Sequence, residues 1–96
     1  MTTPSAIQRF RFVVAGRVQG VGFRWAARTE AVRLGLVGYV RNRPDGAVEG
    51  EAQGDARGLE TFRAWLRHGP PLARVERGSW DEIAAQAGEA AFAIDR

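Results

Sequence analysis

The sequence predicts an α+β protein in which an antiparallel sheet carries two helices on one of its faces. Three observations support this prediction. Apolar and polar residues alternate along residues 7–14, as they do in a half-buried strand. Residues 23–34 and 56–68 instead carry apolar side chains at helical spacing. Between these helices, the turn sequence at 43–46 joins two strand-like stretches into a hairpin.

The first strand, residues 7–14, has two distinct faces. One face carries Phe10, Phe12 and Val14, and the other carries Arg9, Arg11 and Val13. Because successive side chains of a strand point to opposite sides, we expect the first of these faces to lie under the helices.

The first helix is expected from Phe23 to Leu34. Its apolar side is formed by Phe23, Ala27, Ala31 and Leu34. Arg24 lies on a different side of the helix, and Gly35 is placed to end it.

A hairpin follows this helix. We expect its first strand to run from Leu36 to Asn42, with Leu36, Val40 and Asn42 on one face. In the turn, Pro44 fixes φ and Gly46 allows the chain to return. The second strand of the hairpin alternates Val48, Gly50 and Ala52 with Glu49, Glu51 and Gln53.

The second helix is expected from Ala56 to about His68. The side chain of Asp55 can cap its start, and Gly69-Pro70-Pro71 ends it. Its buried stripe is formed by Leu59, Phe62 and Leu66, and Trp65 is expected to widen it.

The remaining residues predict two further strands. Residues 74–80 form the fourth strand, 84–88 a loop, and 92–94 a short extra strand at the C-terminal end. The order β-α-β-β-α-β, with this extra strand, is that of a ferredoxin-like sandwich.

The composition narrows the classes of function. The 96 residues suffice for a single domain (1–96), and we expect residues 1–6 to be flexible. The absence of cysteine excludes disulfides, thiolate metal sites and a cysteine nucleophile. All 14 basic residues are arginine, which excludes lysine chemistry. The lone His68 cannot form a metal site by itself, so we expect no metal and no cofactor.

The net charge of +3 is modest and spread along the chain, which favours small anionic ligands over nucleic acid. No apolar run reaches the roughly 18 residues of a membrane span, and no secretory signal is evident. We therefore expect a cytoplasmic monomer that binds neither nucleic acid nor membranes.

The stretch between the first strand and the first helix predicts an anion-binding loop. It reads Gly16-Arg17-Val18-Gln19-Gly20-Val21-Gly22-Phe23-Arg24. Glycines let successive N–H groups turn toward one point, and the following helix directs the positive end of its dipole there. Arg24 can close the ring with its guanidinium. The stretch lacks the Gly-Lys-Ser/Thr of a P-loop and the third glycine of a dinucleotide site.

This stretch resembles the signature of the acylphosphatase family, as does a second one at 38–49, Gly38-Tyr39-Val40-Arg41-Asn42-Arg43-Pro44-Asp45-Gly46-Ala47-Val48-Glu49. The resemblance implies a metal-independent hydrolase that converts acyl phosphates to a carboxylate and inorganic phosphate. It also implies that Asn42 orients the attacking water, while phosphate is held by Arg24 and the backbone of Val18, Gln19, Gly20 and Val21. One departure is Tyr39, where the family more often has tryptophan.

The lengths of the elements predict that Arg24 and Asn42 meet. A helix over 23–34 is about 18 Å long, and a strand over 36–42 spans about 20 to 23 Å. Because a one-residue joint connects them, the strand runs back alongside the helix and Asn42 returns to the level of the helix start. Each residue also has a simpler explanation: Asn42 can satisfy turn backbone, and most arginines on surface helices are solvated.

The residue types at this site favour acyl phosphates on chemical grounds. The site offers N–H donors, a guanidinium and an amide, but no base or nucleophile within the loop. It therefore suits a leaving group that needs no protonation, such as a carboxylate, rather than the alkoxide of an ordinary phosphate ester. Inorganic phosphate, as the product, should compete with the substrate.

Two other functions are compatible with the same fold. Ferredoxin-like sheets can stack RNA bases on exposed aromatics, but the RNA-binding signature is missing and Phe10 and Phe12 are expected to face the helices. An acylphosphatase-like domain can also work within a larger carbamoyl-transferring protein. Because Met1 lies shortly before the first strand and Arg96 just after the last, we expect no partner domain.

Overall fold

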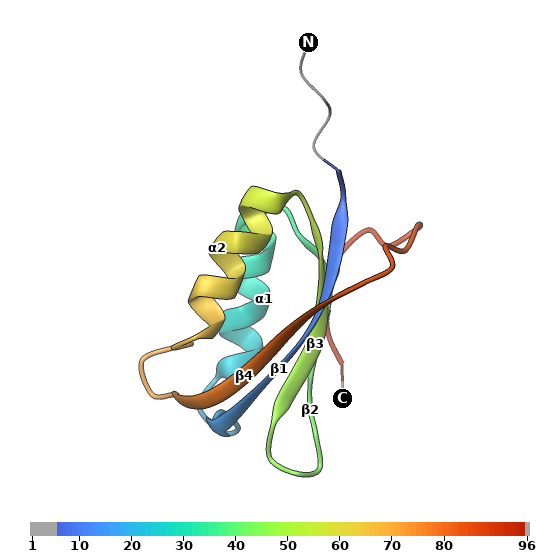
Figure 1. Ribbon diagram of the computed structural model, residues 1–96. Helices are drawn as coiled ribbons and strands as arrows, with labels where there is room; N and C mark the ends of the chain where they lie inside the picture. The colour runs from blue at the N-terminus through green and yellow to red at the C-terminus, as the bar shows by residue number, and fades with distance from the viewer. Residues whose placement is uncertain (1–5, 96) are drawn as a thin grey trace.

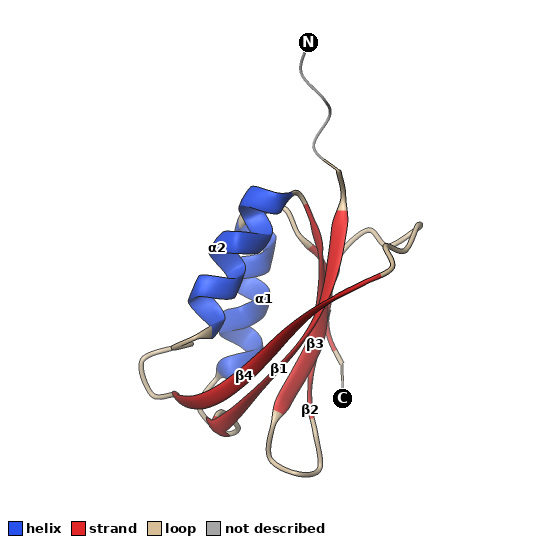
Figure 2. Ribbon diagram, in the orientation of Figure 1, coloured by secondary structure: helices blue, strands red, loops and turns tan. Residues whose placement is uncertain are grey.

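The computed structural model of the protein describes residues 6–95, so the expected flexibility of residues 1–6 falls, except for Ala6, outside the described range. The elements follow one another as β1 (Gln8–Arg17), α1 (Phe23–Arg33), β2 (Val37–Asn42), β3 (Val48–Gly54), α2 (Ala56–Leu66), β4 (Arg74–Ile83) and β5 (Phe92–Ile94). Both helices lie on the same face of a twisted sheet (Figures 1 and 2). Neither helix in the described part of the chain has the length and apolar character needed to span a bilayer.

The strand order of the sheet is β4-β1-β3-β2-β5. The pairs β1–β3, β1–β4 and β2–β3 are antiparallel, whereas β5 pairs with β2 in parallel. The predicted ferredoxin-like sandwich is thus confirmed, and the expected extra strand makes the sheet mixed at one edge. β5 is parallel because the segment after β4 crosses back over the sheet before it reaches β2.

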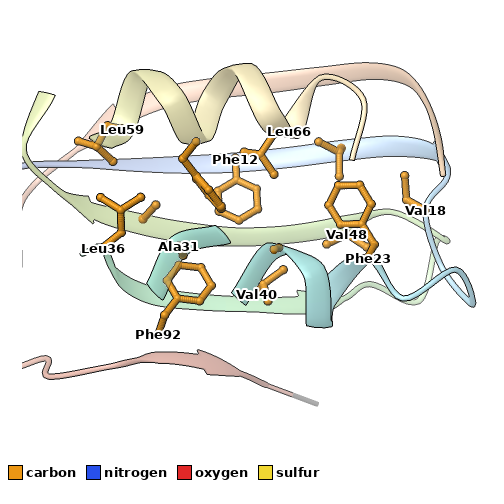
Figure 3. Close-up of a cluster of buried hydrophobic side chains, with 14 residues drawn as sticks. Phe12, Val18, Phe23, Ala31, Leu36, Val40, Val48, Leu59, Leu66 and Phe92 are labelled. Atoms are coloured by element: carbon orange, nitrogen blue, oxygen red, sulfur yellow. The ribbon is translucent and has the colours of Figure 1, made fainter. Parts of the chain in front are cut away.

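The core lies between the sheet and the helices (Figure 3). Phe12 of β1 is 1% exposed and meets Phe62 of α2 edge to face, with 5.6 Å between the ring centroids. Phe62 in turn stacks on Trp65, which confirms that Trp65 widens the buried stripe of α2. The buried apolar cluster consists of Phe12, Val14, Val18, Phe23, Ala27, Ala31, Leu36, Val40, Val48, Ala52, Leu59, Phe62, Leu66 and Phe92. The predicted inward faces of both helices and of the central strands are therefore correct.

β1 continues to Arg17, three residues beyond the predicted end at Val14, and its pairing with β4 shifts register between Ala15 and Gly16. Gly16 has a φ of 130°, and a Cβ there would lie 2.3 Å from the carbonyl oxygen of Arg74. Only glycine can bring the two backbones this close. The bulge redirects the strand into the loop that precedes α1.

The predicted hairpin is present, and Asn42 lies opposite Val48 at the turn. The turn is closed by backbone hydrogen bonds from Arg43 N–H to Ala47 O (2.8 Å) and from Gly46 N–H to Arg43 O (3.2 Å). The side chain of Asp45 accepts a further bond from the Ala47 N–H at 3.1 Å, which lowers the pKa of that carboxyl group.

The second helix begins as predicted, because Asp55 Oδ1 accepts a hydrogen bond from the Gly58 N–H at 2.7 Å. It ends at Leu66 rather than at about His68, since the chain tightens where the Arg67 N–H bonds to Ala64 O at 3.3 Å and the His68 N–H bonds to Trp65 O at 3.2 Å, each three residues back. β4 runs to Ile83 instead of Trp80, because its pairing with the long β1 continues to Arg9.

The face of the sheet away from the helices contains a buried arginine. Arg9 is 1% exposed and forms ion pairs with Glu51 (2.6 Å) and Glu89 (2.7 Å), and it also donates to Gln53 Oε1 at 3.2 Å. Gln53 and Gln86 exchange two hydrogen bonds of 2.8 Å. Glu89 and Gln86 thus bring the segment 84–91 against Arg9 and Gln53, and Figure 1 shows this segment on the side of the sheet away from the helices.

Farther along this face, Glu49 accepts hydrogen bonds from Arg41 (2.7 Å) and Arg11 (3.0 Å). Burial acts to raise the pKa of Glu49, but these two guanidinium groups outweigh it and hold the pKa below its ordinary value. This face of the sheet therefore carries a ladder of ion pairs, in which Arg9, Arg11 and Arg41 have carboxylate partners.

The burial of Arg9 predicts a large and specific effect on stability. Arg9→Ala should lower the free energy of unfolding by about 3 kcal/mol, because it leaves two carboxylates beside a buried void. The matched control is Arg11→Ala, whose side chain is 49% exposed, and it should cost less than about 1 kcal/mol. Urea unfolding followed by circular dichroism measures both, and equal losses in the two variants would contradict the structural role of Arg9.

Candidate active site

The loop between β1 and α1 combines one anchored end with an open glycine-rich stretch. Val18 is 1% exposed and belongs to the core, and Val21 packs against the same cluster. Gly20 and Gly22 have φ values of 74° and 77°, which favour glycine, and a Cβ on either would meet no atom within 4 Å. The backbone of the loop is therefore fixed by the valines and accessible at the glycines.

The start of α1 lacks the usual groups that neutralise a helix N-terminus. Its N-cap residue is Gly22, which has no side chain, and the first turn contains no acidic residue. The first N–H groups of a helix have no partner within the helix, and they carry the positive end of its dipole. This end of α1 can therefore accept an anion.

Arg24 is the second residue of α1 and is half-buried. Among the ion pairs and side-chain hydrogen bonds of residues 6–95, none involves Arg24. Other arginines, such as Arg9, Arg11 and Arg41, have carboxylate partners. The guanidinium of Arg24 is thus available to a ligand at the same helix end.

Asn42 is the last residue of β2, opposite the fully buried Val48. Residues opposite one another on paired strands share a face, so Asn42 points to the helix side, as expected. Its Oδ1 is buried and has no hydrogen-bond partner in the described structure. The simpler explanation, that its side chain satisfies turn backbone, is not supported, because the turn is closed by Arg43, Asp45 and Gly46.

The structure brings these residues to one end of the sandwich. Figure 3 shows three residues together at that end of the core: Val18, Phe23 and Val48. Val18 belongs to the glycine-rich loop, Phe23 directly precedes Arg24, and Val48 is the cross-strand partner of Asn42. A direct link is made by Gln19, whose Nε2 donates to Arg43 O at 2.8 Å and to Ala47 O at 3.0 Å.

Sequence reasoning missed this side-chain contact of Gln19, because it considered only the backbone of the residue. The only sequence signal for this contact was a polar residue, Gln19, between Val18 and Gly20. Such a signal does not reveal a hydrogen-bond partner more than 20 residues away.

Two surface hollows lie beside this end rather than in it. One, of about 310 Å³, lies between α2 and β4, and the other, of about 260 Å³, lies between the hairpin turn and residues 76–77. Neither is lined by Arg24 or Asn42. We place the site at the loop instead, because the unpaired polar groups lie there and a small tetrahedral anion needs no deep cavity.

The arrangement can bind an anion and orient a small molecule beside it. It supplies backbone N–H donors, a helix dipole, a guanidinium and an unpartnered amide oxygen. Within residues 6–95 no group of three or more His, Cys, Asp or Glu side chains is placed to hold a metal ion. Stabilisation of charge and alignment of reactants are the means available to such a site.

Comparison with known proteins places the chain in one family. The acylphosphatase family model matches residues 10–94. An acylphosphatase of Methylococcus capsulatus is 48% identical over 90 residues, which cover 94% of this chain and 98% of that protein. One of Thermococcus kodakarensis is 52% identical over 71 residues, which cover 72% and 78% of the two chains.

The fold gives the same result. The crystal structure of the Bacillus subtilis acylphosphatase is 38% identical, with a TM-score of 0.88 over 93% of this chain and 99% of that one. The chain is thus similar, over nearly its whole described length, to proteins of its own size with the same sandwich. The chain belongs to the acylphosphatase family of hydrolases.

Proposed function

We propose that the backbone of residues 18–21 and the guanidinium of Arg24 hold the phosphoryl group of an acyl phosphate, and that Asn42 orients the attacking water. The observation that carries this proposal is the set of unpaired polar groups gathered at the start of α1. The free N–H groups and Arg24 belong to the start of α1, whereas Asn42 Oδ1 comes from the end of β2, at the same end of the molecule.

The phosphate-binding part of the proposal rests on charge and backbone geometry. A phosphoryl dianion neutralises both the positive helix end and Arg24, whose placement in the first turn is otherwise mildly unfavourable by about 0.3–1 kcal/mol. The left-handed glycines 20 and 22 leave their side of the loop open, so the N–H groups can approach the oxygens closely. Arginine also matches phosphate geometry with two donors.

The role of Asn42 rests on its unpartnered oxygen. A buried acceptor without a hydrogen bond is costly, unless a ligand or water completes it. A water that donates one hydrogen to Asn42 Oδ1 keeps a lone pair free for phosphorus. Asn42 ends β2, and the backbone that carries its amide is held by the pairing with β3.

The reaction follows from these groups without a base in the loop. The water oxygen forms a bond to phosphorus, while the bond between phosphorus and the acyl oxygen breaks and the carboxylate leaves with the electron pair. The protons of the water remain with the phosphate product or pass to solvent. A carboxylate departs without protonation, which explains how a site lacking a general acid can act on acyl phosphates.

The substrate class can be tested directly. The purified protein should hydrolyse benzoyl phosphate in the presence of EDTA, and it should leave glycerol phosphate intact, because an alkoxide needs an acid to protonate it. The loss of benzoyl phosphate absorbance and the release of inorganic phosphate measure the two reactions. Equal rates on the ester and the anhydride would contradict the argument from the leaving group.

Removal of the Arg24 charge should weaken phosphate binding. Arg24→Gln should raise the KM for benzoyl phosphate and the inhibition constant of inorganic phosphate by about 10- to 100-fold, as expected for one lost charge-assisted hydrogen bond. Arg33→Gln is the matched control, because it removes the same charge from the other end of α1, where Arg33 pairs with Glu30. An unchanged inhibition constant in Arg24→Gln would exclude Arg24 from the phosphate site.

Removal of the Asn42 amide should affect turnover instead. Asn42→Ala should lower kcat by about 100-fold, with little change in the inhibition constant of phosphate, because the amide acts on the water rather than on the bound anion. Gln8→Ala, which removes an amide at the far end of β1, serves as the control. Wild-type turnover in a folded Asn42→Ala variant would show that another group orients the water.

A further inference from the structure

The side chain of Gln19 ties the glycine-rich loop to the hairpin. Its Nε2 carries two hydrogens, and both are used, one for Arg43 O at 2.8 Å and one for Ala47 O at 3.0 Å. Gln19 is half-buried, and its partners lie 24 and 28 residues away in the sequence. The contact is therefore a tertiary link and not part of the local geometry of the loop.

The two carbonyl groups stand at the two ends of the hairpin turn, that of Arg43 just after β2 and that of Ala47 just before β3. Arg43 O also accepts from the Gly46 N–H at 3.2 Å, and Ala47 O from the Arg43 N–H at 2.8 Å. The amide of Gln19 thus bridges both strands where they separate. A shift of either strand end would break one of its two bonds.

This bridge lies next to Asn42 at the end of β2 and next to its cross-strand partner at the start of β3. Arg43 directly follows Asn42, and Ala47 directly precedes Val48, the cross-strand partner of Asn42. Asn42 itself has a buried Oδ1 without a partner, so no hydrogen bond to that oxygen fixes its position. Its distance from the loop is therefore set by the backbone that carries it, and Gln19 holds that backbone.

We infer that Gln19 is a positioning residue that sets the distance between the phosphate-holding loop and the water-orienting amide of Asn42. The inference rests on the proposed function of these two parts. The backbone of Gln19 belongs to the loop while its side chain holds the hairpin, so a single residue connects the two halves of the site. Errors of about 1 Å in such a distance can cost about 100-fold in rate.

The other anchor of the loop has a different effect. Val18 is buried in the core and fixes the loop relative to the helices and the sheet. This anchor keeps the loop backbone in place when the Gln19 side chain is removed. Loss of that side chain should consequently leave the phosphate cradle intact and displace only the end of β2.

The test is a double-mutant cycle between Gln19 and Asn42. Gln19→Ala should lower kcat for benzoyl phosphate by about 10-fold, with a change of less than about 2-fold in the inhibition constant of inorganic phosphate. In the Asn42→Ala background the same substitution should cause no further loss, because the amide that it positions is already absent. Gln8→Ala, combined with Asn42→Ala in the same way, is the matched control and should leave kcat unchanged in both backgrounds.

Four outcomes would overturn the inference. Equal losses of kcat in the two backgrounds would show that Gln19 acts independently of Asn42. A weaker phosphate affinity with unchanged kcat would assign Gln19 to the cradle alone. A lower melting temperature with wild-type kcat would make it a residue of the fold only. If Gln19→Ala does not fold, Gln19→Met keeps the length of the side chain without its donors, and failure of that variant to fold also overturns the inference.

The proposed function can fail separately from this inference. In that case the unmodified protein would not hydrolyse benzoyl phosphate, which is seen before any substitution is made. An active wild-type protein with an additive double-mutant cycle would instead retain the proposed function and reject only the role of Gln19.

Discussion

The uncapped start of α1 is the feature on which the rest of the site depends. Because Gly22 provides no side-chain cap and the first turn contains no acidic residue, the positive helix end stays unneutralised within residues 6–95. The fold then determines what can approach it. α1 connects β1 to β2, and these two strands run in the same direction because each is antiparallel to β3 between them. The end of β1, the start of α1 and the end of β2 therefore meet at one end of the sandwich (Figure 1). The loop and the guanidinium of Arg24, which are neighbours in the sequence, therefore share this end with the amide of Asn42, which comes from a later strand.

The two faces of the sheet divide stability and function between them. On the helix side, an apolar cluster fixes Val18 and Phe23, and with them the loop and the first turn of α1. On the other side, Arg9 and the ladder around Glu49 pair most of their charge with carboxylates. The abundance of arginine is thus largely structural on that face. Arg24 differs from these residues because it lies at the edge of the helix layer without a carboxylate partner among the described residues.

Many elements could be predicted from residue patterns because their causes are local. Alternation placed Phe12 and Val14 inward, the Asp55 cap fixed the start of α2, and the turn residues at 43–46 indicated the hairpin. The predictions that missed were decided by partners distant in sequence. β4 is longer than its weak alternation indicated because β1 continues to pair with it, and Arg9 is buried because the segment 84–91 crosses over it.

The sequence by itself determined the sandwich, the glycine loop and the residue types of the site, since each of these depends on periodicity, on glycine at a left-handed φ or on the order of short elements. Only the tertiary structure decided which polar groups are left without partners, because pairing depends on every neighbour that a side chain meets. It satisfied Arg9 and Gln19 through distant contacts, and it left the Asn42 oxygen unpaired. Hydrogen-bond partners in a folded chain are a property of the packing, and no local pattern records them.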